Sequence, residues 1–250
     1  MSTFTIHATH RGAEGVGATV NRAFPTAGRD HVDPFVLLDH FAVGEGGVPE
    51  HVHRGFEIVT YMLEGGLAHT DGTGVSKTAT AGGAMRMRCG SGLRHAEHPA
   101  TDDPARGLQL WINLPREDKE VEPDYRDADP GELPVDVRDG LGVTTVVGEG
   151  SPLDLRADVR YQVVEADAGS TYEWPVEAGW SALCYVIEGA VTIPDGTIES
   201  REVAVRDGRK RRSATDDATI PVEATEDATY ALVAGHPLDQ PITQRGPIVR

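Results

Sequence analysis

Two short stretches decide the fold class and the chemistry of this chain: E-H-V-H-R-G-F-E-I-V-T-Y-M-L-E-G at residues 50–65 and G-S-G-L-R-H-A-E-H-P at residues 90–99. Each stretch contains two potential metal ligands that are two residues apart: His51 and His53 in the first, His95 and Glu97 in the second. In a β-strand, residues i and i+2 point to the same face, so each pair can bind a metal ion together. If the two strands meet, three imidazoles and one carboxylate converge on one point.

The rest of the 250-residue chain is typical of an all-β protein. It contains 29 glycines, and turn-forming residues separate short apolar runs, as in β-sandwiches and β-barrels. Residues 116–134 are charged and rich in proline, so we expect a connector between a first domain at 1–115 and a second at 135–250.

The two halves resemble each other in one strand. V-T-Y-M-L-E-G at residues 59–65 is similar to L-C-Y-V-I-E-G at residues 183–189. This similarity predicts an internal repeat of two barrels, although two ordinary apolar strands can also look alike by chance. Nine of the ten histidines lie at or before His98, and the tenth is His236. We therefore expect one metal site per chain, in the first half, and a second domain without metal ligands.

The charge of the chain argues against several classes of partner. The formal net charge is −17, and only three of the 23 basic residues are lysines. Such a chain should not bind nucleic acid directly or associate with anionic membranes. The composition favours a potassium-rich, halophilic cytoplasm over an ordinary acidic cytosolic protein. The one basic run, at residues 206–212, is expected to be a solvated loop.

Other signals indicate a cytoplasmic protein. Cys89 and Cys184 form no spacing motif, and the sequence shows neither a signal peptide nor a long apolar segment. We also expect a monomer.

Three neutral nitrogens and one carboxylate suit Fe(II), Mn, Co, Ni, Cu or Zn. On a six-coordinate ion they leave two positions open for a substrate and dioxygen. A closed structural zinc site more often uses cysteine, and neither cysteine is placed for it. The competing interpretation is that these histidines are simply solvated on exposed strands.

Several motifs resemble those of the pirin family of bicupins. They are the two stretches quoted above, D-P-F-V-L-L-D-H-F at 33–41, H-T-D-G-T-G at 69–74, L-Q-L-W-I-N-L-P at 108–115 and A-G-H-P-L-D-Q-P-I-T-Q-R-G-P at 234–247. Val52 departs from the family pattern, which usually has proline there. The resemblance implies two stacked cupin barrels, with iron in the N-terminal one held by His51, His53, His95 and Glu97.

The resemblance also implies two functions. One is a quercetin 2,3-dioxygenase, in which a flavonol or similar aromatic enol reacts with O2 and Glu97 serves as both ligand and proton acceptor. The other is an iron-bound, redox-sensing coregulator of transcription with a protein partner. A cupin isomerase or a metal-free protein is the remaining alternative.

Three further residues near the two stretches need an assignment. In the broader cupin pattern a glutamate follows the second histidine, which makes Glu57 an alternative ligand, but we expect it to contact a ligand residue or to form a salt bridge instead. We expect His98 at the rim of the site and His69 in a turn.

Overall fold

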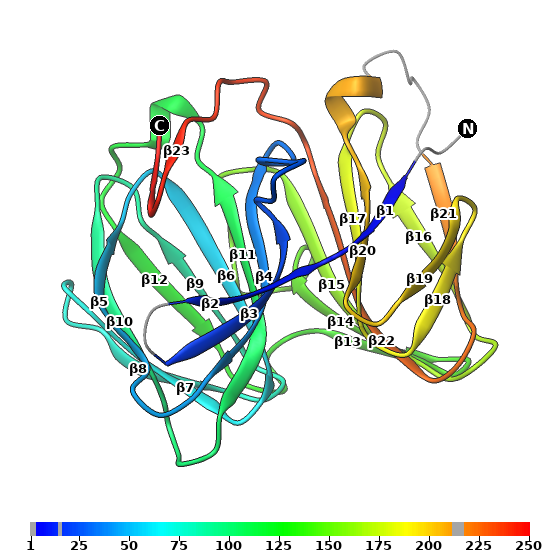
Figure 1. The fold of residues 1–250 in the computed structure, drawn as a ribbon, viewed down its shortest axis with the longest axis horizontal. Helices are drawn as coiled ribbons and strands as arrows, with labels where there is room; N and C mark the ends of the chain where they lie inside the picture. The colour runs from blue at the N-terminus through cyan, green and yellow to red at the C-terminus, as the bar shows by residue number, and fades with distance from the viewer. Residues whose placement is uncertain (1–3, 15–16, 212–217) are drawn as a thin grey trace.

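The computed structural model describes residues 4–14, 17–211 and 218–250 of the chain, without the side chains of Lys210 and Arg211. The described residues form β-strands and two short 3-10 helices, η1 (Arg116–Asp118) and η2 (Gly208–Arg211). The strands build two barrels that lie side by side (Figure 1). The predicted all-β fold of two stacked cupin barrels is confirmed.

The first barrel consists of a seven-stranded and a four-stranded antiparallel sheet. The large sheet has the order β12-β9-β6-β11-β4-β3-β2, and the small one the order β5-β10-β7-β8. The strands are β2 (His10–Glu14), β3 (Ala18–Phe24), β4 (Phe35–Val43), β5 (Val48–His53), β6 (Phe56–Glu64), β7 (Gly66–Asp71), β8 (Ser76–Thr80), β9 (Ala84–Arg88), β10 (Leu93–Pro99), β11 (Ala105–Asn113) and β12 (Asp124–Ala128).

The second barrel repeats this plan. Its large sheet has the order β1-β20-β17-β22-β15-β14-β13 and its small sheet the order β16-β21-β18-β19. The strands are β1 (Thr5–Ala8), β13 (Val135–Arg138), β14 (Leu141–Val147), β15 (Val159–Ala166), β16 (Thr171–Val176), β17 (Ser181–Glu188), β18 (Ala190–Ile193), β19 (Gly196–Glu199), β20 (Glu202–Arg206), β21 (Ala218–Ala224) and β22 (Ala228–Gly235). The two similar segments lie on β6 and β17, which are third from the same end of their sheets, so the internal repeat is structural.

Three short segments do not follow the predicted division into a first domain at 1–115, a connector at 116–134 and a second domain at 135–250. Strand β1 pairs with β20 of the second barrel, and β12, inside the expected connector, pairs with β9 of the first. Near the C-terminus, β23 (Gln244–Arg245) and β24 (Ile248–Val249) return to the first barrel. These strands are short and largely half-buried or exposed, so they carry no apolar pattern that the sequence could reveal.

The returning C-terminal segment packs closely against the first barrel. Val249 is buried in one cluster with Phe56 and Trp111. Gly55 allows this approach, because a Cβ atom there would lie 2.0 Å from the carbonyl oxygen of Val249, and its φ is +84°. The glycine of the H-x-H-R-G motif thus makes room for the end of the chain.

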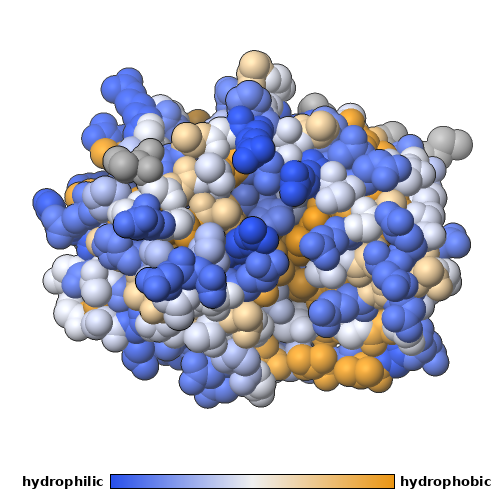
Figure 2. Space-filling model, turned by 60° about the horizontal axis from the view of Figure 1, so that its bottom comes forward, coloured by the Kyte–Doolittle hydropathy of each residue, from blue (hydrophilic) through white to orange (hydrophobic). Residues whose placement is uncertain are grey.

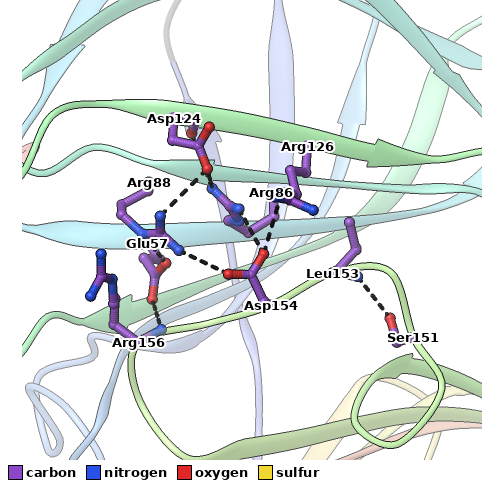
Figure 3. A network of polar contacts seen from close by, with 9 residues as sticks. All are labelled: Glu57, Arg86, Arg88, Asp124, Arg126, Ser151, Leu153, Asp154 and Arg156. Carbon is purple, nitrogen blue, oxygen red and sulfur yellow. Dashed lines mark hydrogen bonds and ion pairs between the residues drawn. The ribbon is translucent and has the colours of Figure 1, made fainter.

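The two large sheets pack against each other through an apolar core and a polar network at its margin. Both faces of β6 are buried: Ile58 packs inside the first barrel, and Val59 packs against the second. At the margin, Glu57 accepts hydrogen bonds of 2.9 Å from Arg88 Nε and from the Arg156 backbone N–H (Figure 3). Arg86 is fully buried beside them and binds Asp124 at 2.7 Å and Asp154 at 3.0 Å.

The surface agrees in part with the expectations from charge. Figure 2 shows a largely hydrophilic face, with apolar surface between the two halves and along the lower margin of the second. The basic run is not simply a solvated loop, because Arg206 ends β20 and is buried, while Arg212 lies outside the described residues. No described helix is both long and apolar enough to cross a membrane.

Candidate metal centre

Strands β5 and β10 bring the two ligand pairs together. They pair antiparallel, with His95 opposite His51 and Leu93 opposite His53. The register then shifts between His95 and Glu97, which indicates a β-bulge. The alternation along each strand and this pairing place all three imidazoles on the inner face of the first barrel.

The Nε2 atoms of the three histidines converge. His51 Nε2 lies 2.8 Å from His53 Nε2 and 3.0 Å from His95 Nε2. Burial, and then the neighbouring His51, lower the pKa of His53 to about 3. Burial also lowers the pKa of His95 far below its ordinary value, so both rings are neutral near pH 7.

Hydrogen bonds at Nδ1, the ring nitrogen that does not converge on the site, fix the tautomers of His51 and His95. His51 Nδ1 lies 2.8 Å from the Pro49 carbonyl, which can only accept, so Nδ1 carries the proton. His69 Nε2 lies 3.1 Å from Asp71 Oδ2 and donates to it, which leaves His69 Nδ1 as an acceptor. His95 Nδ1, 3.3 Å from His69 Nδ1, must therefore donate. In both His51 and His95 the Nε2 lone pair is left to point into the site.

His69 is a part of the site that the sequence prediction misplaced. It lies on strand β7, not in a turn; its side chain is fully buried and stacks on Tyr125. Asp71 is held in turn by the backbone N–H and hydroxyl of Thr73. A signal was present, because His69 and Asp71 are also two residues apart and so share a face of their strand.

Glu97 is buried beside the imidazoles. Its Oε1 makes no hydrogen bond and lies 4.0 Å from His95 Nδ1. Gln109 accepts a 3.0 Å hydrogen bond from Trp111 through its oxygen, so its amide nitrogen is the group that donates to Glu97. Burial raises the pKa of Glu97 to about 7, and the Gln109 hydrogen bond opposes this rise.

The potential ligand atoms form two overlapping groups. His51, His53 and His95 make the first, and His69, His95 and Glu97 make the second. Glu57 lies outside both groups: it faces the second barrel and forms a salt bridge with Arg88. His98, which we expect at the rim of the site, is exposed and is not among the residues that line the cavity at this site.

A cavity of about 900 Å³ leads to this site from the surface. Its lining includes His51, His53 and Glu97 and the apolar side chains of Leu37, Phe41, Val43, Val48 and Trp111. Residues of the returning C-terminal segment, among them Ile242 and Pro247, also line it. His53 Nδ1 makes no hydrogen bond of good geometry, although the Pro247 carbonyl lies close enough to oppose the fall of the His53 pKa.

Comparison with known proteins identifies the family. Residues 17–112 match the Pirin family model, and residues 161–250 match the model of the Pirin C-terminal cupin domain. The chain is 37% identical to human Pirin over 95% of this chain and 83% of that protein. The chain belongs to the pirin family. A Pirin-like protein of Caulobacter vibrioides is 38% identical, over 95% of this chain and 88% of the relative.

Solved structures agree with this assignment. The crystal structure of a quercetin 2,3-dioxygenase from Acinetobacter baumannii superposes on this pirin-family chain with a TM-score of 0.88. The two sequences are 26% identical, and the match covers 100% of this chain and 92% of the other.

The donor set of this pirin-family chain fits a six-coordinate divalent ion. Metal–nitrogen bonds of about 2.0–2.1 Å at right angles place two nitrogens about 2.8–3.0 Å apart, whereas tetrahedral bonds place them about 3.3–3.4 Å apart. The observed separations of 2.8 and 3.0 Å match the first arrangement. Lone pairs this close repel each other unless a cation lies between them. Glu97 Oε1 has no hydrogen-bond partner, but it lies 4.0 Å from His95 Nδ1 and outside the group that the three histidines form.

Metal affinity should depend on pH through Glu97. Because the pKa of Glu97 is about 7 in the metal-free protein, a metal that binds this carboxylate must displace a proton below pH 7. The apparent affinity should therefore fall by up to about tenfold per pH unit below 7 and level off above it. Titration of Co(II) by calorimetry at several pH values checks this, and a Glu97→Gln variant should lose that part of the pH dependence.

Glu97 also makes the stability of the metal-free fold depend on pH, but this stability falls, rather than rises, as the pH increases. The folded-state pKa of Glu97 lies above its ordinary value of 4.5, so the folded state holds the proton more tightly than the unfolded chain. Its contribution to stability is complete below pH 4.5 and is lost as the pH rises through about 7.

Proposed function

We propose that this chain is an Fe(II)-dependent cupin dioxygenase that opens an aromatic enol of the flavonol type with O2. The observation that carries the proposal is the convergence of three imidazole Nε2 atoms beside a cavity of about 900 Å³ that two of these histidines line. The similarity to the Acinetobacter quercetin 2,3-dioxygenase supports the substrate class.

Four residues would hold the iron: His51, His53, His95 and Glu97. When bound, the ion supplies Lewis-acid stabilisation of an enolate oxygen and redox chemistry toward O2. Glu97 would also be the carboxylate that accepts the proton of the substrate hydroxyl. Gln109 keeps this carboxylate in place, and the apolar walls around Trp111 and Phe41 exclude water from the reacting atoms.

Oxygen uptake and quercetin loss by the Fe(II)-loaded protein test this function. Wild type should consume both, and His53→Ala should abolish the consumption. His98→Ala is the matched control, because His98 is exposed and next to Glu97 in sequence but on the other side of the strand. An inactive wild type, or equal activity in wild type and His53→Ala, would falsify the proposal.

The coregulator function implied by the family resemblance makes a different prediction. An adaptor needs a surface that changes with the redox state of iron, but it needs no cavity of about 900 Å³ that leads to the metal ligands. A regulator would leave quercetin and O2 untouched and would capture a transcription factor only in one oxidation state. The cavity therefore favours the enzyme.

The cavity wall should select uncharged substrates. Arg22 lies in this wall with its charge neutralised, because it binds Asp39 through Nε at 2.9 Å and Nη2 at 2.6 Å, and also binds Glu14. We expect quercetin to bind better than a sulfonated flavonol. Asp39→Asn should remove the main counter-charge of Arg22, leave it only the Glu14 contact, and improve binding of the sulfonate by about tenfold relative to quercetin.

Competition binding with the two flavonols measures this ratio. Glu14→Gln is the control, because it removes only one contact and keeps the double contact between Arg22 and Asp39. An unchanged ratio in Asp39→Asn would show that Arg22 does not contribute to selection.

A further inference from the structure

Strand β13 exposes two large apolar side chains at the edge of the second barrel. Val135 is 57% exposed and Val137 is 79% exposed. Among the described residues only one other large apolar side chain, Val52, is exposed. Strand β13 is the last strand of its seven-stranded sheet and lies on the lower side of the second barrel in Figure 1. Exposed apolar side chains on an edge strand indicate a surface that another strand can cover.

The backbone of this strand is also available on its outer side. The Thr145 N–H donates to the Pro134 carbonyl, so Pro134 is a hydrogen-bonded position of the β13–β14 ladder. Because these positions alternate, Asp136 and Arg138 also bond to β14, and the N–H and C=O groups of Val135 and Val137 point outward. In the described part of the chain, no strand other than β14 pairs with β13.

A tight turn holds the strand ready for pairing. Asp139 and Gly140 connect β13 to β14 and have φ angles of +46° and +75°. Two consecutive residues with positive φ are typical of the type I′ turn, which matches the natural twist of a hairpin. The edge is therefore formed before any partner binds.

We propose that β13 pairs antiparallel with β13 of a second copy of this chain, across a two-fold axis at Val137. The proposed dimer departs from the monomer that we expect from the sequence. In this register the two Val137 residues face each other and exchange two backbone hydrogen bonds. Asp136 of each copy lies opposite Arg138 of the other, so the V-D-V-R strand is complementary to itself in charge.

The charges also exclude the neighbouring two-fold register. With the two-fold axis at Asp136, the outward backbone N–H and C=O groups of both Val135 and Val137 could form hydrogen bonds between the copies. This register would, however, place the two Asp136 carboxylates directly opposite each other. Within one chain Arg138 already lies 3.3 Å from Asp136, so only a small change of partner is needed to form the ion pairs between copies. The interface is short and works against a net charge of −17 on each copy, so the dimer should be weak.

Sedimentation equilibrium up to about 1 mM protein, in about 0.15 M salt, tests the proposal. The mass of wild type should rise with concentration toward twice that of the monomer. Val137→Pro should remain monomeric, because it removes an outward N–H without removing a bond to β14. Asp136→Arg and Arg138→Asp should each weaken association about tenfold, since every dimer contains two such pairs.

The double variant Asp136→Arg/Arg138→Asp identifies the register, because it restores opposite charges and should dimerise like wild type. Thermal melts confirm that each variant folds, and the charge variants keep the test valid if Val137→Pro does not. A wild type that stays monomeric throughout, or a Val137→Pro variant that dimerises equally, overturns the proposal. Failure of the double variant to recover overturns the register.

Discussion

His53→Ala is expected to lower the affinity for Fe(II) by more than about 100-fold and to abolish turnover. Loss of a residue that only orients a metal ligand already costs about 10- to 100-fold in affinity, and His53 is placed to be a ligand itself. Its Nε2 lies 2.8 Å from that of His51, so the variant removes one of the three converging Nε2 atoms. Metal analysis after dialysis against a weak chelator measures the loss directly.

His69→Phe should lower the metal affinity less than His53→Ala does. It keeps a ring that can stack on Tyr125 but removes the acceptor that fixes the His95 tautomer. We expect a loss of about 10- to 100-fold, smaller than for His53→Ala. His98→Ala should bind metal normally. Full iron content in His53→Ala would contradict the assignment of the site.

Glu57→Gln is expected to lower stability by about 3 kcal/mol without changing the metal content. The substitution keeps the size of the side chain but leaves the buried Arg88 without its main counter-charge. We choose the lower end of the usual range of about 3–5 kcal/mol because Arg88 still lies 3.4 Å from Asp124 and from Asp154. For a chain of this size, this corresponds to a fall in Tm of roughly 6–12 °C.

A double variant separates the net contribution of the Glu57–Arg88 ion pair to stability from the destabilisation caused by removing only one of its charges. Burial raises the pKa of Glu57 even though the Arg156 N–H and Arg88 oppose the rise, so the fold gains little net stability from this charge. Glu57→Leu/Arg88→Met should therefore lose less stability than Glu57→Gln, since no charge of the pair remains buried alone. If Glu57→Gln instead loses its metal, Glu57 contributes to the metal site.

The two single substitutions have opposite expected effects. His53→Ala should remove metal and leave the metal-free fold intact, because it relieves the crowding of imidazoles. Glu57→Gln should weaken the contact between the barrels and spare the metal. The two residues lie close in sequence, and the face of the sheet toward which each side chain points separates their roles.

The sequence alone determined the fold class and the two pairs of candidate ligands, and it indicated the repeat. Alternation along a strand is a local property, so the pairs His51 with His53 and His95 with Glu97 could be recognised without any tertiary contact. The composition likewise predicts a potassium-rich cytoplasm, and that stays a prediction.

Only the tertiary structure decided which other residues complete the site. His69 and Gln109 come from β7 and β11, and their contacts with His95 and Glu97 depend on which strands become neighbours. The direction in which Glu57 points could not be predicted from the sequence either. Strand β6 is buried on both faces, one inside the first barrel and one against the second, so its apolar pattern could not show toward which face this carboxylate points.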